Sequence, residues 1–363
     1  MRLFQNSGLS VAYRARMGLV ARGTSRFAER LAAFVADRYG ASHLLLPVLA
    51  GWKNAFLTNS DDETLQRLWA NEQGMPSTST QEDILLAQIE AHRAEVFYNL
   101  DPMRWQTPFL KRLPGTVRKK ICWRAAPSPG ADFSAYDAVV CNFPSIVEEW
   151  RTMGWRAAIF YPAHDPVMDN FAGIEDRSID VLFVGTYSRH HRNRIGVLDA
   201  VARLSPRFNV RFCLDRSRLT RISETPLGLL GPLAKHRRPD PIRAVSSNPV
   251  FGLDLYRAIG QSKIVLNGAI DMAGSDRGNM RCFESMGCGA LMVSDVGDYP
   301  PGMLDGETML TYRTLDEALQ LIVQALGNWP AFSPIARNGH RLVSQKYSKS
   351  AQWDAFERLV ESL

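Results

Sequence analysis

The chain has 363 residues, of which 45% are hydrophobic, and a formal net charge of +6. This length suits two domains of roughly 150–200 residues each. No apolar run reaches the roughly 18 residues that a membrane-spanning helix needs, and the polar start of the chain does not resemble a signal peptide. We therefore expect a cytoplasmic protein whose positive charge favours anionic partners.

The cysteines and the basic runs indicate no special chemistry. The five cysteines are an odd number without paired spacing, which predicts reduced core thiols and neither a disulfide framework nor a zinc site. The densest basic runs, at 118–120, 189–194 and 235–238, are typical of solvated surface. No basic–aromatic pattern accompanies them, so we do not expect a nucleic-acid partner.

Helix and strand patterns alternate along the chain, which predicts an α/β fold with parallel sheets. The first half has predicted strands at 2–4, 43–49, 94–101, 121–123, 138–141 and 157–161, and predicted helices at 25–37, 82–93 and 144–153. A polar crossover follows, and the pattern restarts. The second half has predicted strands at 181–184, 210–213, 263–266 and 291–295, and predicted helices at 193–204, 253–259, 315–326 and 351–363.

This repetition predicts two Rossmann-like domains, at 1–165 and 166–345, followed by a C-terminal helix within 346–363. In open α/β sheets, ligands bind beyond the carboxyl ends of the strands. We therefore expect binding residues after the strands at 181–184 and 263–266, in a cleft between the domains.

The segment Ser275–Ala290 carries the strongest chemical signal. If the chain is helical from Arg277 onward, then Arg277, Arg281 and Glu284 lie on one face of the helix. Two cations, the amide of Asn279 and a carboxylate at a helix start suit the phosphates and hydroxyls of a sugar nucleotide. The alternative without a functional role is an exposed helix with an ordinary Arg281–Glu284 ion pair.

The residues Ser-Lys-Ile-Val-Leu-Asn at 262–267 and Arg-Gly-Asn-Met-Arg-Cys-Phe-Glu-Ser-Met-Gly-Cys-Gly at 277–289 resemble the donor-binding region of GT-B glycosyltransferases. The resemblance is to the glycosyl transferases group 1 type, in the spore-maturation-protein-like branch. That family usually has two glutamates separated by seven residues, and here Asp276 and Glu284 keep the spacing. Residues 181–187 and 251–256 also resemble the family.

The resemblance implies a GT-B fold, with the donor in the C-terminal domain, the acceptor in the N-terminal domain and a C-terminal helix that crosses back to the N-domain. It also implies that Glu284 holds the donor ribose and that Asp276 lies near the donor sugar. Without a metal, cations and amides must meet the charge of the leaving group. The candidates for this role are Arg277 or Arg281, the amides near Gly278, the loop Gly185–Ser188, which includes Tyr187, and Arg192. Asn279 is expected to hydrogen-bond the sugar or a phosphate, and Asn267 is a further donor-binding candidate.

Two further residues are candidates from their positions alone. His164, in the crossover, is a candidate base or hydrogen-bond donor to the substrate. Asp101 ends a predicted strand of the first domain and is a candidate for facing the acceptor, although an acid there is also typical of a turn.

The leading hypothesis is therefore a hexosyl-type glycosyltransferase that moves a sugar from a nucleoside-diphosphate sugar to an acceptor hydroxyl, with retention and without a metal or cofactor. The acceptor, whether a glycan, a lipid-linked sugar or a protein, is undetermined, and peripheral contact with the inner membrane face is compatible with a lipid-linked one. The alternatives are an epimerase of the same fold, or a non-catalytic binder of anions, nucleic acid or a membrane surface.

Overall fold

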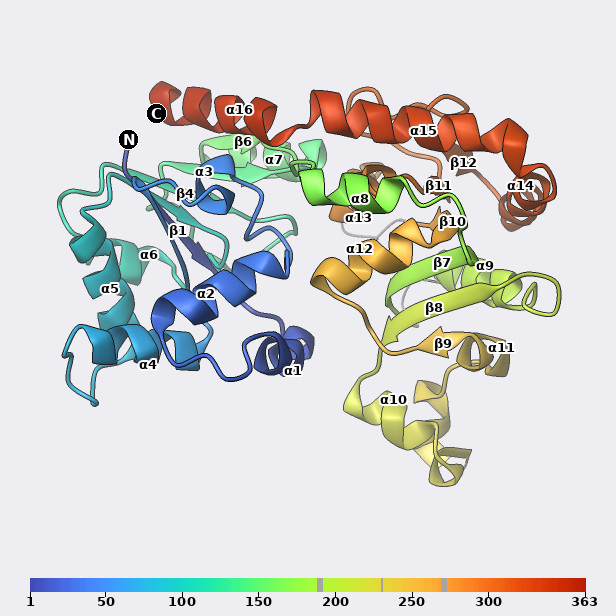
Figure 1. Ribbon diagram of the computed structural model, residues 1–363, viewed down its shortest axis with the longest axis horizontal. Coiled ribbons are helices and arrows are strands. Elements are labelled where there is room, and N and C mark those ends of the chain that lie inside the picture. Colours follow the sequence, from blue (N-terminus) through green and yellow to red (C-terminus); the bar gives the residue numbers. More distant parts are fainter. Residues whose placement is uncertain (188–191, 230, 269–272) are drawn as a thin grey trace. The chain divides into compact units, whose positions relative to one another are not determined.

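The computed structural model describes residues 1–187, 192–229, 231–268 and 273–363, which divide into two compact units. The first unit comprises Met1–Ala163 and Tyr347–Leu363, with the described residues of a short segment that ends at Gly274. The second unit comprises the remaining described residues between His164 and Lys346. Each unit has helices around one parallel sheet (Figure 1), which confirms the predicted α/β class with two parallel sheets.

The sheet of the first unit has the strand order β2-β1-β3-β4-β5-β6 among the described residues. Its strands are β1 (Leu3–Ser7), β2 (Ala55–Asn59), β3 (Val96–Asn99), β4 (Lys119–Trp123), β5 (Ala138–Cys141) and β6 (Ala157–Ile159). The helices of this unit are α1 (Val11–Val20), α2 (Phe27–Ala36), α3 (Leu46–Leu49), α4 (Glu63–Glu72), α5 (Gln81–His92), α6 (Thr107–Leu110), α7 (Pro144–Thr152) and α16 (Lys349–Ser362).

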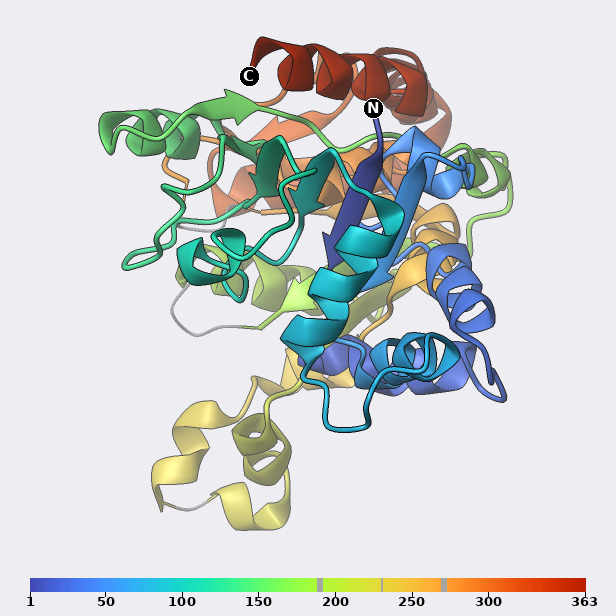
Figure 2. The same ribbon diagram turned by 90° about the vertical axis from the view of Figure 1, so that its left-hand side faces the viewer.

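Helices cover both faces of this sheet. Side chains alternate between the faces of a strand, so neighbours on β3 point in opposite directions. Phe97 packs in one apolar cluster with Leu85 and Ile89 of α5, the teal helix in front of the strands in Figure 2. Tyr98 instead contacts Phe356 of α16, with ring centroids 4.9 Å apart. Helices α5 and α16 therefore cover opposite faces.

The apolar run at 43–49 does not form the predicted strand. It forms turns and the short helix α3, with Pro47 in its first turn. Proline has no N–H to donate to a sheet, and it favours the first turn of a helix. Leu44, Leu45 and Val48 are buried all the same, which accounts for the apolar pattern. The strand that pairs with β1 is β2, a few residues later.

Helix α16 belongs to the first unit, although the second unit precedes it in the sequence. Lys349 is buried, and its Nζ donates a hydrogen bond to the carbonyl oxygen of His43 at 2.6 Å. Trp353 and Phe356 are buried, and the ring of Trp353 contacts that of Trp52. The helix thus completes the core of the first unit.

We expect Phe356→Ala to lower the free energy of unfolding of the first unit by about 3–5 kcal/mol, because it empties a fully buried site. Urea unfolding followed by tryptophan fluorescence measures the change. Arg358→Ala, on the exposed side of the same helix, is the control and should change stability by less than about 0.5 kcal/mol. Equal effects of the two substitutions would contradict the packing of α16.

The sheet of the second unit has the order β12-β11-β10-β7-β8-β9 among the described residues. Its strands are β7 (Ile179–Thr186), β8 (Val210–Asp215), β9 (Ser246–Ser247), β10 (Ser262–Leu266), β11 (Leu291–Asp295) and β12 (Leu310–Tyr312). The helices are η1 (Pro166–Met168), α8 (Asp169–Ala172), α9 (Arg192–Ala202), α10 (Arg218–Ser223), η2 (Pro226–Leu229), η3 (Gly231–His236), α11 (Asp240–Ala244), α12 (Gly252–Gly260), α13 (Met280–Gly287), α14 (Leu315–Gly327) and α15 (Trp329–Lys346).

This second sheet is also covered on both faces, which explains why its central strands are continuous apolar runs. Val181 of β7 packs with Leu198 of α9 and Ile322 of α14. Its neighbour Leu182 packs with Ile259 of α12. Helices α9 and α14 therefore lie on one face, and α12 lies on the other.

In each unit the strand order reverses beside the first strand. In the first unit β2 lies on one side of β1 and β3 on the other, and in the second unit β8 and β10 flank β7 in the same way. Crevices at the carboxyl ends of such strands are the usual ligand sites of open α/β sheets. The edge at β1 and β3 and the edge at β7 and β10 are therefore where ligands are expected.

All five cysteines are buried and free of disulfides, in agreement with the prediction of reduced core thiols. Within the described ranges, no helix has the length and apolar character that crossing a membrane would require.

Candidate active site

Two asparagines meet at the carboxyl end of β10, beside the strand-order reversal of the second sheet. Asn267 directly follows β10, and its backbone N–H donates to the carbonyl oxygen of Val293 in β11 at 2.8 Å. Nδ2 of Asn279 donates to Oδ1 of Asn267 at 3.2 Å. Because Asn279 immediately precedes α13, this contact ties the end of β10 to the start of that helix.

Arg277 lies at the end of the neighbouring strand β11. Its Nε donates to Oδ2 of Asp295, the last residue of β11, at 2.7 Å. Gly297 permits this approach, since a Cβ there would lie 2.5 Å from Cγ of Arg277. Asp295 is absent from the predicted site, because a contact across 18 residues leaves no local pattern in the sequence.

A short parallel bridge fixes the residues before α13. Asp276 pairs with Asp298, and the backbone N–H of Arg277 donates to the carbonyl oxygen of Asp298 at 2.9 Å. Asp276 is 7% exposed, and Gly278 is also buried. The acid that the resemblance places near the donor sugar is therefore a buried part of this bridge.

Arg281 and Glu284 form an ion pair on α13, with 2.6 Å between Nη1 and Oε2. Glu284 is 7% exposed. Burial raises the pKa of its carboxyl, and the charge of Arg281 opposes that shift. Nε of Arg281 is buried and has no hydrogen-bond partner among the described residues. The Arg281–Glu284 pair is thus largely desolvated, and the Nε–H of Arg281 remains available as a hydrogen-bond donor. An ordinary ion pair on an exposed helix would have neither property.

Helix α13 begins at Met280, three residues later than predicted. Arg277 therefore lies in the loop before the helix, and the expected single face with Arg277, Arg281 and Glu284 is wrong. Arg277 instead forms an ion pair with Asp295, and Arg281 forms one with Glu284. The apolar side of α13 is as expected, with its aromatic residue Phe283 fully buried.

The edge at β7 also differs from the prediction. The strand runs two residues further than expected, so Gly185 pairs with Leu214 of β8 and is not a loop residue. Tyr187 packs against an apolar cluster of the second unit, and burial raises its pKa. Ser188 and the side chain of Arg192 lie outside the described residues.

Arg194 lies at the same edge, although in the sequence it is only one member of a basic run. Its Nη2 donates to the carbonyl oxygen of Thr186 at 3.0 Å. A Cβ on Gly268, just after β10, would lie 3.5 Å from Cδ of Arg194. Arg194 therefore places a cation between the carboxyl ends of β7 and β10, where the strand order reverses.

His164 is not brought together with Asn267 or Arg277. It is 4% exposed and lies at the end of α13 opposite to Asn279, where a Cβ on Gly287 would be 3.1 Å from its Nδ1. Its Nε2 is 2.9 Å from Oδ1 of Asp169, and burial lowers its pKa. His164 is therefore packed against the end of α13 and away from the two asparagines, and a catalytic role for it stays a prediction.

In the first unit, a cavity of about 350 Å³ opens at the carboxyl ends of β1 and β3. Ser7, Gly8, Tyr39, Asp61 and Asp101 are among its lining residues. The approach of β3 to β1 is close here, since a Cβ on Gly8 would lie 3.2 Å from Oδ2 of Asp101. This cavity occupies the strand-order reversal of the first sheet.

The two acids of the cavity have different environments. Asp61 accepts hydrogen bonds from Arg14 at 3.0 Å and from Arg104 at 2.8 Å. Asp101 has no ion pair among the described residues. Burial, and then the nearby charge of Asp61, raises the pKa of Asp101, while Arg104 and Arg124 oppose the shift. Asp101 is thus the acid left for a ligand in this cavity.

A buried hydrogen-bond chain positions Asp101. Nδ2 of Asn6 donates to Oδ1 of Asn99 at 2.9 Å, and Nδ2 of Asn99 donates to the Tyr136 hydroxyl at 2.6 Å. That hydroxyl donates to the carbonyl oxygen of Trp105 at 2.6 Å. Oδ1 of Asn99 also accepts from the backbone N–H of Asp101 at 3.0 Å. These hydrogen bonds hold the carboxyl ends of β1 and β3 side by side and fix the backbone of Asp101.

A larger cavity of about 450 Å³ in the second unit includes none of the predicted site residues. It lies around Arg177 and Gly289, before the start of β11. The guanidinium of Arg177 donates to the carbonyl oxygens of Ser262 and Ala172, at 2.9 and 3.0 Å, which indicates a structural role.

Across the described residues, no three His, Cys, Asp or Glu side chains gather as a metal site would require. That the reaction needs neither a metal nor a cofactor stays a prediction.

Comparisons with known proteins agree with this architecture. Residues 209–358 match the family model described as glycosyl transferase-like. No curated protein matches the chain. Among solved structures, HepE of Anabaena in complex with UDP and glucose is 13% identical, with a TM-score of 0.58 over all of both chains.

Two further structures span nearly the whole chain. A glycosyltransferase from Rickettsia africae is 10% identical, with a TM-score of 0.57 over 99% of this chain and 97% of that one. Sucrose-phosphate synthase from Thermosynechococcus elongatus is 12% identical, with a TM-score of 0.51 over 99% and 98%. The narrower assignment to the spore-maturation-protein-like branch stays a prediction. The chain thus has the GT-B fold, and its residues 209–358 match the glycosyl transferase-like family model.

Proposed function

We propose that the protein transfers a hexose from a nucleoside-diphosphate sugar to an acceptor hydroxyl, with retention of configuration and without a metal. The observation that carries the proposal is the set of polar groups at the β7–β10 edge, of which Asn267, Arg277 and Asn279 lie inside the glycosyl transferase-like match. Asn267, Arg277, Asn279 and Arg194 all reach this edge. Structures of HepE contain UDP or UDP-glucose, which supports a nucleotide sugar as donor.

In this proposal the second unit binds the donor. Arg277 and Arg194 face the diphosphate together with backbone N–H groups at the start of α13. Asn267 and Asn279 hold the sugar or a phosphate oxygen. Glu284 accepts a hydrogen bond from the ribose, and Nε of Arg281, which is buried without a partner among the described residues, donates to the ligand.

The first unit binds the acceptor in the cavity at Asp101. The acceptor oxygen forms a bond to the anomeric carbon while the bond from that carbon to the diphosphate oxygen breaks. The electron pair leaves with the nucleoside diphosphate, whose phosphate takes the proton of the acceptor hydroxyl. Asp101 accepts a hydrogen bond from that hydroxyl and orients it, and the cations of the second unit stabilise the charge on the leaving group.

A thermal-shift panel of UDP, GDP and ADP tests the donor site. We expect one of them to raise the unfolding temperature, because a ligand at about 100 times its Kd stabilises the folded state by about 2.7 kcal/mol. The matching nucleoside without phosphates is the control and should protect much less. Failure of all three diphosphates to protect at millimolar concentration would contradict the proposal.

The epimerase alternative makes a different prediction. An epimerase converts a nucleotide sugar without an acceptor, whereas a transferase releases the nucleoside diphosphate in proportion to the acceptor added. Analysis of the products with and without a panel of hydroxyl acceptors therefore separates the two reactions.

A further inference from the structure

The positive charge of the chain is concentrated in one segment. Residues 216–245 contain seven Arg and Lys residues and two acidic residues, an excess of five, against +6 for the whole chain. The segment connects β8 to β9 and forms α10, η2, η3 and α11. In Figure 1, α11 lies beside β9, the edge strand of the second sheet, and α10 lies beyond it.

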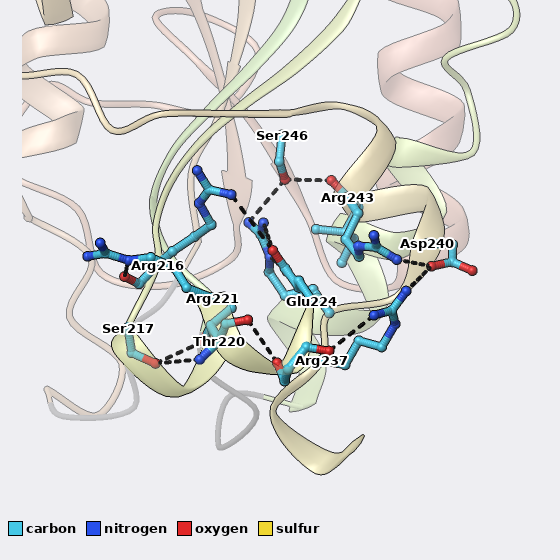
Figure 3. A network of polar contacts seen from close by, with 12 residues as sticks. Arg216, Ser217, Thr220, Arg221, Glu224, Arg237, Asp240, Arg243 and Ser246 are labelled. Atoms are coloured by element: carbon cyan, nitrogen blue, oxygen red, sulfur yellow. Dashed lines mark hydrogen bonds and ion pairs between the residues drawn. The ribbon is translucent and has the colours of Figure 1, made fainter. Parts of the chain in front are cut away.

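Four of these cations are used inside the segment (Figure 3). Glu224 binds Arg238 at 2.5 and 3.0 Å and lies 3.9 Å from Arg216. Arg238 is 3% exposed and also donates to Oγ of Ser246 at 3.2 Å. Because this pair is buried and hydrogen-bonded, it holds α10 to the chain that enters β9.

Asp240, the other acid, faces Arg243 at 2.7 Å and Arg237 at 3.9 Å. Both acids are therefore already matched by cations. Arg237 also donates to the carbonyl oxygen of Ser223 at 3.1 Å, which links the chain before α11 to the end of α10. These contacts form a scaffold that needs no external partner.

Three cations remain without an acid among the described residues: Arg218, Arg221 and Lys235. All three are exposed, and Nε of Arg221 donates only to the carbonyl oxygen of Arg216. On α10, Arg218 and Arg221 alternate with Leu219 and Ile222, which are 46% and 37% exposed. The outer side of α10 therefore presents cations and large apolar side chains together.

We propose that this surface, formed by α10 and Lys235 of η3, docks on anionic lipid headgroups at a membrane surface. Cations near such a surface are attracted by its negative potential, and each contributes roughly a fivefold gain in binding. Exposed leucine and isoleucine enter the boundary between headgroups and acyl chains. Single-stranded nucleic acid is disfavoured, because binding it relies on aromatic stacking and residues 216–245 contain no Phe, Tyr or Trp. The inference does not depend on the proposed donor site.

Co-sedimentation of the full chain with vesicles tests the proposal, using phosphatidylcholine alone and phosphatidylcholine mixed with phosphatidylglycerol. We expect binding to the mixed vesicles only, with an affinity that falls as salt is added. The triple variant Arg218→Gln/Arg221→Gln/Lys235→Gln should bind about a hundredfold more weakly. The double variant Leu219→Ser/Ile222→Ser should also bind more weakly, at unchanged net charge.

The matched control is Arg313→Gln/Arg341→Gln/Lys346→Gln, which removes two arginines and a lysine from exposed positions elsewhere in the second unit. It should bind as the unmodified chain does. Equal losses in the two triple variants would mean that overall charge alone is responsible and would overturn the proposal. No binding to the mixed vesicles, or displacement from them by single-stranded RNA, would also overturn it.

Discussion

Glu284→Ala should weaken the binding of a nucleoside diphosphate by about tenfold to a hundredfold. A hydrogen bond to a charged group contributes about 1.5–3 kcal/mol, which corresponds to that range in the Kd. The substitution should also destabilise the second unit, since it leaves Arg281 largely buried without its acid. Breaking one side of such a pair costs about 3–5 kcal/mol.

A double-mutant cycle separates these two effects. Glu284→Ala and Arg281→Met are made singly and together, and each variant is measured by isothermal titration with the best nucleotide of the panel and by urea unfolding. If Glu284 holds the ribose, its loss weakens nucleotide binding in both backgrounds. If Glu284 acts only by fixing Arg281, its loss has no effect on binding once Arg281 has become methionine.

Asp101→Asn should lower turnover by about tenfold to a hundredfold and at the same time stabilise the first unit at neutral pH. Turnover falls because an amide cannot replace the carboxylate that orients the acceptor hydroxyl. Stability rises because burial and Asp61 raise the pKa of Asp101. A carboxyl with a raised pKa favours folding while it is protonated, and that contribution is lost as the pH rises through the raised value.

Thermal unfolding of the unmodified chain and of Asp101→Asn between pH 3 and 8 checks whether the substitution stabilises the first unit. This measurement requires no knowledge of the acceptor. The unmodified chain should be less stable than Asp101→Asn at neutral pH, and the difference should disappear in acid, where Asp101 is protonated. Asp132→Asn is the control, because that aspartate is exposed and its hydrogen bonds with Ser134 lower its pKa. It should lose stability at neutral pH. A gain for Asp132→Asn equal to that of Asp101→Asn would contradict the assignment.

Much of the fold could be predicted, because parallel strands buried on both faces are apolar runs that stand out from their surroundings. The runs at 181–184 and 263–266 correspond to β7 and β10 in this way. The run at 43–49 has the same composition, but Pro47 and the packing of a short helix decide its structure. Helix α15 carries prolines at 330 and 334, which conceal a helical pattern.

The candidate site was less accessible from the sequence. Its residue types were identified around α13, because a dense polar segment between apolar strands is a local feature. Their partners were not, because Arg277–Asp295 and Asn267–Asn279 depend on which strands become neighbours. The sequence pattern places the start of α13 three residues too early, because neither residue at the boundary, Asn279 or Gly278, excludes a helix by itself.

The position of α16 has a consequence for biosynthesis. Helix α16 completes a core that begins at β1, so the first unit cannot close until the ribosome has released residues near 356. The second unit, by contrast, has all of its residues once Lys346 has emerged. Although it is encoded later than most of the first unit, it can therefore finish folding earlier, and the first unit must wait with one face of its sheet exposed, in a state prone to aggregation.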